Sequence, residues 1–317
     1  MENFKISDLE PRFLEPQGIE WGGLELNDES GAVMRYAKLE HQGANKGNIL
    51  ILQGFSEFIQ KYFELMRDLS GAGYTVFSFD WRGQGKSTRF LKKYPMRPYS
   101  MGFERDILDM KHFIEAVMPK GEEKHVFAHS MGGHLALRFL HDNPTVFERA
   151  VLSAPMLGFK LPASRGIILT LIRFLRLIGR DVMQASKGGA WSDKNIPLEN
   201  DPRSHDKMRR LVQYVYALNT PDLRMDNASF GWVYQAIRSL NMLEGGGYLE
   251  TLTTPILIGI AENEEIVDNA AIERIAERLK NAECMTLKDS RHEIFMERDE
   301  IRDVFLRQAL LFIENQG

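Results

Sequence analysis

The stretch HVFAHSMGGH, residues 125–134, decides the fold. A β-prone run leads into Ser130, two glycines follow, and a helical pattern then begins. A tight turn between a strand and a helix can lift a serine hydroxyl clear of the backbone, provided that small residues two places before and after it let the two elements approach. Ala128 and Gly132 fill those places. The stretch therefore predicts a nucleophilic serine at a strand–turn–helix junction.

Short apolar segments on both sides of this stretch alternate with helical patterns. Short buried strands that alternate with helices are typical of a parallel sheet covered on both faces. The sequence thus predicts an α/β fold with a mostly parallel central sheet flanked by helices. The expected strands are 20–26, 32–38, 48–52, 75–79, 125–128, 149–153 and 256–260, and the expected helices include 58–70, 103–117 and 131–141.

The alternation stops between about Pro155 and Gly247. This part has the pattern of helices and loops, and it closes at the run Gly245-Gly246-Gly247. A helical block inserted in an α/β domain is most simply a cap over the edge where the parallel strands end, which is where such sheets bind ligands. We therefore expect a core formed by residues 1–154 and 248–317, and a helical cap, or lid, formed by residues 155–247.

Several short stretches, taken in order, resemble the α/β-hydrolase superfamily and, within it, the branch of lysophospholipases and monoacylglycerol lipases. They are QGFSE (53–57), DWRGQGKS (80–87), HSMGG (129–133), the acidic loop 261–269 and RHE (291–293), and the acidic loop looks most like that of the bacterial lysophospholipases. The chain departs from the family pattern at Gln53, where histidine is usual, and at Ala128, where glycine is usual. The resemblance implies a triad in the order serine, acid, histidine. It also implies hydrolysis of a carboxylic ester of a single-chain lipid, with no cofactor.

His292 is the expected base for Ser130, since a serine hydroxyl is a poor nucleophile without one. It follows the last strand-like run and precedes the C-terminal helix, which is where the resemblance places the base. Four other histidines lie near Ser130 in the sequence and are expected to be structural: His125, His129, His134 and His141. Three more have no supporting context: His41, His112 and His205.

The acid of the triad is expected in the loop after the strand 256–260. This loop, AENEEIVDN (261–269), holds four carboxylates, so its composition cannot choose among them. Position favours Glu264, a few residues beyond the strand. Asp268 is the alternative, although a residue just before a helix more often caps it. The family often has aspartate here, but a glutamate is sufficient because the acid has only to orient and stabilise the imidazolium.

Phe55 and Met131 are expected to supply the two backbone N–H groups of an oxyanion hole. Met131 follows the nucleophile, and Phe55 lies in the loop after the strand 48–52. Asp80 and Arg82 are expected to stabilise the loop beneath the site. The Gly-x-Gly of residues 83–85 lacks the third glycine of a nucleotide-binding loop, and no cysteine–histidine cluster has metal-ligand spacing. We therefore expect neither a metal nor a cofactor.

Charge and hydropathy restrict the partners. Lys and Arg number 40 against 44 Asp and Glu, a net charge of -4, so no attraction to nucleic acid is expected. The single cysteine, Cys284, allows no intrachain disulfide. The N-terminal residues lack the pattern of a secretory signal, and the most apolar stretch, 167–178, is too short to span a bilayer. We expect a cytoplasmic protein and leave its oligomeric state open.

Residues 167–180 predict an amphipathic helix of the cap that governs access for the lipid chain. Arg173, Arg176 and Arg180 are spaced to share one face, and much of the remaining surface is apolar. Two interpretations stay open. The helix can pack on its neighbours with its arginines solvated or paired. Alternatively, its basic face can meet anionic headgroups at the inner membrane face while its apolar side lines the acyl channel.

Other functions also stay open at this point. The same machinery serves small-ester esterases, thioesterases and serine aminopeptidases. An aminopeptidase would need acidic cap residues that bind the free amine of its substrate. A hydrolase fold can also serve as a binding protein without activity, in which case a fluorophosphonate probe would leave Ser130 unlabelled.

Overall fold

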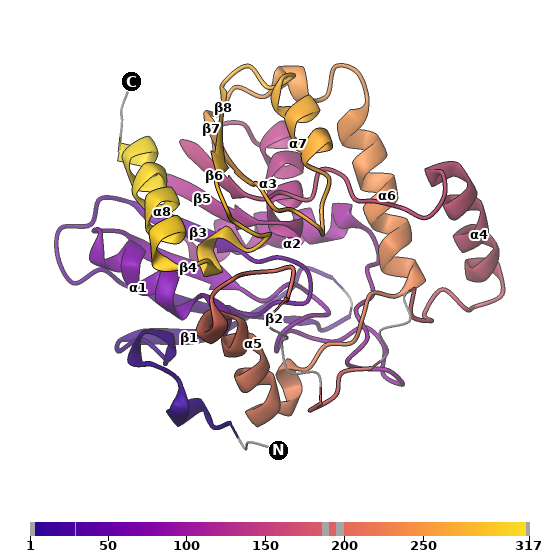
Figure 1. Ribbon diagram of the computed structural model, residues 1–317, viewed down its shortest axis with the longest axis horizontal. Helices are drawn as coiled ribbons and strands as arrows, with labels where there is room; N and C mark the ends of the chain where they lie inside the picture. The colour runs from indigo at the N-terminus through magenta and orange to yellow at the C-terminus, as the bar shows by residue number, and fades with distance from the viewer. Residues whose placement is uncertain (1–3, 29, 186–189, 195–199, 315–317) are drawn as a thin grey trace.

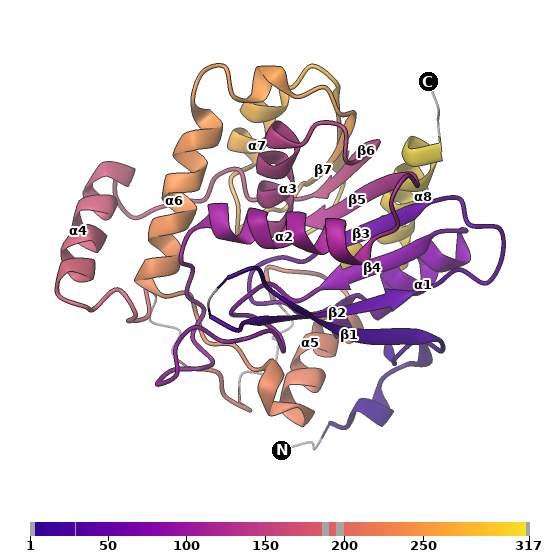
Figure 2. The same cartoon turned by 180° about the vertical axis from the view of Figure 1, so that it is seen from behind.

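The computed structural model describes residues 4–28, 30–185, 190–194 and 200–314. Its centre is an eight-stranded sheet in the order β1-β2-β4-β3-β5-β6-β7-β8 (Figures 1 and 2). β2 runs antiparallel to both β1 and β4, whereas the other neighbouring strands are parallel. The predicted α/β fold is therefore confirmed. The strands are β1 Ile19–Glu25, β2 Val33–Leu39, β3 Asn48–Leu52, β4 Thr75–Phe79, β5 Lys124–His129, β6 Arg149–Ser153, β7 Ile256–Ala261 and β8 Ala282–Leu287.

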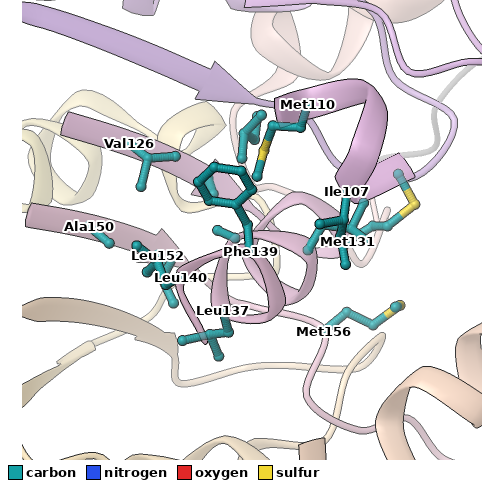
Figure 3. Close-up of a cluster of buried hydrophobic side chains, with 14 of the residues drawn as sticks. Ile107, Met110, Val126, Met131, Leu137, Phe139, Leu140, Ala150, Leu152 and Met156 are labelled. Atoms are coloured by element: carbon teal, nitrogen blue, oxygen red, sulfur yellow. The ribbon is translucent and has the colours of Figure 1, made fainter. Parts of the chain in front are cut away.

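Both faces of the sheet are covered. Since successive side chains of a strand point to opposite sides, each strand contributes to a separate core on each face. In β3, Leu50 and Leu52 join one core, which includes residues of α2, α3 and α7, while Ile49 and Ile51 join a second core with α1 and α8. Figure 3 shows part of the first core, where Phe139 lies among the side chains of the neighbouring strands. The helices are α1 Phe63–Gly71, α2 Phe103–Val117, α3 Met131–Asp142, α7 Asn269–Ala276 and α8 Asp299–Glu314.

One predicted helix begins differently in the structure. The segment expected as a helix over 58–70 starts with a 3-10 turn, Ile59–Tyr62, before α1 follows. The N–H of Ile59 donates to the Asp80 carboxylate at 3.0 Å, which anchors the start of this turn to the end of β4. Because 3-10 turns commonly precede α-helices, the change is local, but it directs residues 57–62 toward the site described below.

In the described part of the interval between β6 and β7, which is expected to form the cap, there are three α-helices. They are α4 Arg165–Leu177, α5 Lys207–Asn219 and α6 Phe230–Glu244. α4 packs against α6 at the periphery of the molecule, and α5 packs beside the 3-10 turn Ile59–Tyr62 (Figures 1 and 2). Positions 186–189 and 195–199 of the expected cap lie outside the described residues, as does position 29 of the turn between the first two strands. The cap boundaries remain a prediction.

The prediction for α4 is wrong at its C-terminal end. The helix ends at Leu177, and Gly179 adopts a left-handed conformation with φ of 67°. Glycine readily adopts this conformation at the end of a helix, so the chain turns away there. Arg180 consequently lies beyond the helix and does not share a helical face with Arg173 and Arg176.

Candidate active site

Ser130 stands on the sharp turn between β5 and α3. Its φ is 49°, a conformation that a residue with a side chain holds only when its surroundings impose it. Two backbone hydrogen bonds fasten the turn: the N–H of Ser130 donates to the Ser153 carbonyl at 3.1 Å, and the Ser130 carbonyl accepts the N–H of Met156 at 2.9 Å. At Gly132, an added Cβ would lie 2.4 Å from the Leu52 carbonyl oxygen, so only glycine fits there.

His292 lies between Ser130 and Glu264. Its Nε2 is 3.1 Å from the Ser130 Oγ, and its Nδ1 is 2.8 Å from a carboxylate oxygen of Glu264. A carboxylate can only accept, so Nδ1 carries the proton and Nε2 is left to accept the proton of the serine hydroxyl. All three side chains are buried or nearly so. The structure thus brings together the serine, histidine and glutamate that the sequence singled out.

Glu264 is fixed in the loop after β7 by its own backbone neighbours. One carboxylate oxygen accepts the N–H groups of Ile266, at 2.7 Å, and Val267, at 3.1 Å, and the other accepts the His292 ring. Burial would raise the pKa of Glu264, but the hydrogen bonds from His292, Ile266 and Val267 and the electrostatic attraction to the His292 ring outweigh it and lower the pKa below its usual value. The group is therefore an ionised carboxylate at neutral pH.

Asp268, the alternative acid, is used elsewhere. Its carboxylate accepts the N–H of Ala270 at 3.1 Å and caps the N-terminus of α7. Its own N–H donates to the Gly158 carbonyl at 3.0 Å. This is the capping role weighed for Asp268 from the sequence.

Hydrogen bonds hold the loop around Phe55 through the backbone N–H groups of the residues on both sides of Phe55. The N–H of Gly54 donates to Glu57 at 2.6 Å, and the N–H of Ser56 donates to the Gln84 side chain at 2.6 Å. Among the described residues, none accepts a hydrogen bond from the backbone N–H of Phe55 or of Met131. These two N–H groups are the ones expected from the sequence to form an oxyanion hole.

Gln84 is a supporting residue that the sequence analysis did not identify. It belongs to the stretch DWRGQGKS, in which Asp80 also supports the loop by accepting the N–H of Ile59, at the end of the loop, at 3.0 Å. Arg82, in contrast, turns away from the site and forms two hydrogen bonds of 2.7 Å with Asp109 on α2. The stretch therefore does support the loop, but through Asp80 and Gln84.

His129 is the other histidine close to the site. Its ring lies 4.7 Å from that of His292, and its Nδ1 donates to the Ser153 carbonyl at 3.1 Å. Burial lowers its pKa to about 4 despite the nearby Glu57, so the ring is neutral. It is therefore a fixed, uncharged neighbour of His292, in keeping with the structural role expected for it.

A pocket of about 510 Å³ opens over Ser130 and His292, within the range usual for small-molecule sites. Much of its wall is apolar or aromatic and comes from both the core and the insertion. None of the described residues that line it belongs to α4, so this pocket does not support the interpretation in which the apolar side of α4 lines an acyl channel. Its apolar and aromatic lining comprises Phe55, Phe58, Trp191, Tyr214, Ala217, Leu223, Met225 and Ile266.

One segment of the insertion fastens the loop that carries His292. We call this segment, residues 203–205, the clamp. The carbonyl of Arg203 accepts the N–H of Glu293 at 2.7 Å, and the N–H of His205 donates to the buried Glu297 carboxylate at 3.1 Å. Part of the insertion is therefore integral to the site and does not act as a separate cover.

Known proteins resemble this chain over most of its length. Residues 43–299 match the family described as serine aminopeptidase, S33. The chain is 28% identical to a probable lysophospholipase L2 of Haemophilus influenzae, over 88% of this chain and 87% of the relative. It is 27% identical to lysophospholipase L2 of Escherichia coli, over 85% and 81%.

A solved structure agrees with the fold. The crystal structure of a soluble variant of monoglyceride lipase from Saccharomyces cerevisiae, in complex with a substrate analog, superposes with a TM-score of 0.73 at 18% identity and covers 100% of both chains. These likenesses confirm the resemblance inferred from the short sequence stretches. The chain belongs to the serine aminopeptidase S33 family and has the α/β-hydrolase fold.

Proposed function

We propose that this protein is a serine hydrolase that cleaves carboxylic esters of single-chain lipids. The observation that carries the proposal is the His292 ring, hydrogen-bonded on one side to Glu264 and on the other to Ser130, at the base of a pocket whose wall is in part apolar and aromatic. The relatives named lysophospholipase and monoglyceride lipase support the lipid substrate.

The proposed reaction is a two-step acyl transfer. Ser130 attacks the ester carbonyl while His292 takes the hydroxyl proton, and the N–H groups of Phe55 and Met131 stabilise the negative oxygen. The intermediate expels the alcohol, which receives the proton from His292. A water molecule, activated by the same ring, then attacks the acyl–serine bond and releases the fatty acid and free Ser130.

An aminopeptidase function receives less support. Binding a free amine requires an acidic side chain that the pocket leaves accessible, whereas those of Glu57, Glu293 and Asp226 are only 5%, 7% and 6% exposed. Of the carboxylates of described residues lining the pocket, Glu57 and Glu293 share Lys61, and Asp226 lies 4.0 Å from Arg97 and accepts the N–H of Trp191. The apolar wall of the pocket favours an acyl chain instead.

A substrate panel tests the proposal. Long-chain monoacylglycerols and lysophospholipids are expected to give a kcat/KM at least about tenfold above that of a short-chain ester, because each methylene buried in the pocket contributes about 0.8 kcal/mol. Aminoacyl amides are expected to release no amine. Faster turnover of an aminoacyl amide than of any lipid ester would replace the lipase proposal with the peptidase one.

We further propose that α4 brings the protein to a lipid surface. Its buried side faces α6, whereas an apolar stripe of Ile167, Leu171, Phe174, Leu177 and Ile178 is exposed, Leu177 by 85%. Such an apolar helix face on the outside of a protein favours insertion into the interface of a bilayer. No helix among the described residues is long and apolar enough to cross a membrane.

The arginines of α4 contribute less to this contact than their spacing suggested. Arg176 lies 3.5 Å from Asp181 and stacks over Tyr234, and Arg173 lowers the pKa of the same tyrosine by its proximity. They are thus engaged with the insertion itself. The apolar stripe is therefore the part of α4 that we expect to bind lipid.

Replacing Leu171, Phe174 and Leu177 together with serine is expected to weaken binding to lipid vesicles by about 10²-fold, since each side chain would lose about 1 kcal/mol of burial. Turnover of a soluble short-chain ester should stay the same. The matched control replaces Leu108 and Leu311, exposed on α2 and α8, with serine and should bind vesicles as the parent does. Equal vesicle binding by the parent and the triple variant in flotation assays would contradict the proposed contact.

A further inference from the structure

A buried ion cluster connects the loop of Phe55 to the loop of His292. It consists of Glu57, Lys61 and Glu293, and we call it the linking cluster. The Lys61 ammonium forms a salt bridge with the Glu57 carboxylate and lies 2.7 Å from a carboxylate oxygen of Glu293. The side chain of Lys61 is 2% exposed, and those of the two glutamates are 5% and 7% exposed.

An ion cluster this deeply buried is costly unless its geometry satisfies every charge. Here the two carboxylates hold the Lys61 ammonium between them. Burial alone would lower the pKa of Lys61, but Glu293 and Glu57 raise it, so the group remains charged. One ammonium and two carboxylates leave the cluster with a single net negative charge.

Each end of the linking cluster reaches one part of the proposed machinery. At one end, the second Glu57 oxygen accepts the N–H of Gly54 at 2.6 Å and the hydroxyl of Tyr62 at 2.6 Å, which orients the peptide that leads to Phe55. At the other end, Glu293 directly follows His292 in the chain. Lys61 therefore spans the gap between the oxyanion loop and the loop of the base.

We propose that Lys61 is a positioning residue that sets the oxyanion loop and His292 at their working separation. The inference rests on the proposed function, because it assumes that the N–H of Phe55 and the His292 ring act on one reacting group. Glu57 and Glu293 line the pocket, but Lys61 is not one of its lining residues, so Lys61 would act through these two glutamates. A displacement of about 1 Å between two parts of an active site can cost about 10²-fold in rate, so loss of the Lys61 bridge is expected to lower kcat even if the two loops move only slightly.

The linking cluster also contributes to the charge around His292. The groups on the elements packed about this ring are Glu264 after β7, the neutral His129 at the end of β5, Arg203 of the clamp, and the linking cluster itself. Removing the Lys61 charge lowers the net charge of the groups around the His292 ring by one. The protonated ring should then be favoured, so the acid limb of kcat/KM against pH should move to higher pH.

The main experiment compares Lys61→Met with Lys61→Arg. In Lys61→Met, kcat is expected to fall about 10²-fold with KM nearly unchanged, and the acid limb to move up by about 1 pH unit. In Lys61→Arg, the charge and the bridge are kept, so kcat and the position of the acid limb should stay close to those of the parent. The rate at which a fluorophosphonate labels Ser130 should follow the same order as kcat.

The double variant Lys61→Met with Glu293→Gln separates position from charge. It keeps the parent's net charge, and its remaining carboxylate keeps its hydrogen bonds from Gly54 and Tyr62, so it should fold even if the single variant does not. Its acid limb should return to that of the parent, while kcat and the labelling rate stay low because the bridge is absent. Parent-like labelling and kcat in the double variant would overturn the proposal.

Arg82→Met is the matched control for a purely structural effect. Arg82 is another buried cation held between two carboxylates, here Asp28 and Asp109, and its side-chain hydrogen bonds reach neither the loop of Phe55 nor the loop of His292. Its replacement should lower the melting temperature without changing kcat or the pH profile of the folded protein. If the parent labels with the probe but hydrolyses no lipid ester, the proposed substrate is wrong, and the labelling rates still decide whether Lys61 positions the site.

Discussion

Ser130→Ala is expected to lower kcat for monoacylglycerols and lysophospholipids by about 10⁴- to 10⁶-fold. The His292 ring would then have no hydroxyl to deprotonate, and only water could attack the ester. Measurement of initial rates with purified protein, together with loss of fluorophosphonate labelling, checks this result.

The fold should survive this substitution. Alanine adopts the φ of 49° at no greater cost than serine, and the two backbone hydrogen bonds of the turn remain. The circular dichroism spectrum and melting temperature should therefore match those of the parent. Retention of more than about a tenth of the activity would mean that another residue is the nucleophile.

Glu264→Gln should have the second largest effect, a loss of about 10³- to 10⁴-fold in kcat. The amide of glutamine can donate to Nδ1 of His292, which stabilises the tautomer with its proton on Nε2, and that nitrogen could no longer accept the proton of Ser130. The negative charge that stabilises the imidazolium is lost as well. Rates measured across pH 6 to about 9 would record both losses.

Asp268→Asn is the matched control, because it makes the same chemical change four residues later in the same loop. Asparagine caps helices as well as aspartate does, so α7 should keep its start and kcat should change by less than about tenfold. If this variant proved more damaging than Glu264→Gln, the role of the acid would pass to Asp268.

Local sequence patterns predicted most of the fold and the residues brought together at the site. The strand before Glu264 is a continuous apolar run, and the strand before Ser130 has an apolar centre; both are buried throughout because both faces of the sheet are covered. The strand–turn–helix pattern around Ser130 indicated the turn, and His292 was indicated by its place after the last strand. These signals are contained within a few residues of the chain.

The supporting contacts could not be predicted, since they join segments that are distant in sequence. Nothing around Lys61 indicates that its partner beyond Glu57 is Glu293, and nothing around Gln84 indicates that it accepts the N–H of Ser56. The face that α4 exposes also depended on tertiary packing. Its sequence is apolar on more than one side, and contact with α6 decides which side is buried.

The clamp has a consequence for exchanging parts between related enzymes. A cap transplanted as one block from a relative would bring its own residues to the place where Arg203 and His205 bind Glu293 and Glu297. The transplanted cap would disturb the base even if its own fold were perfect. A chimera that exchanges only the part around α4 should keep its catalytic rate and alter only how the enzyme meets its substrate, so the useful crossover points in this insertion lie before residue 203.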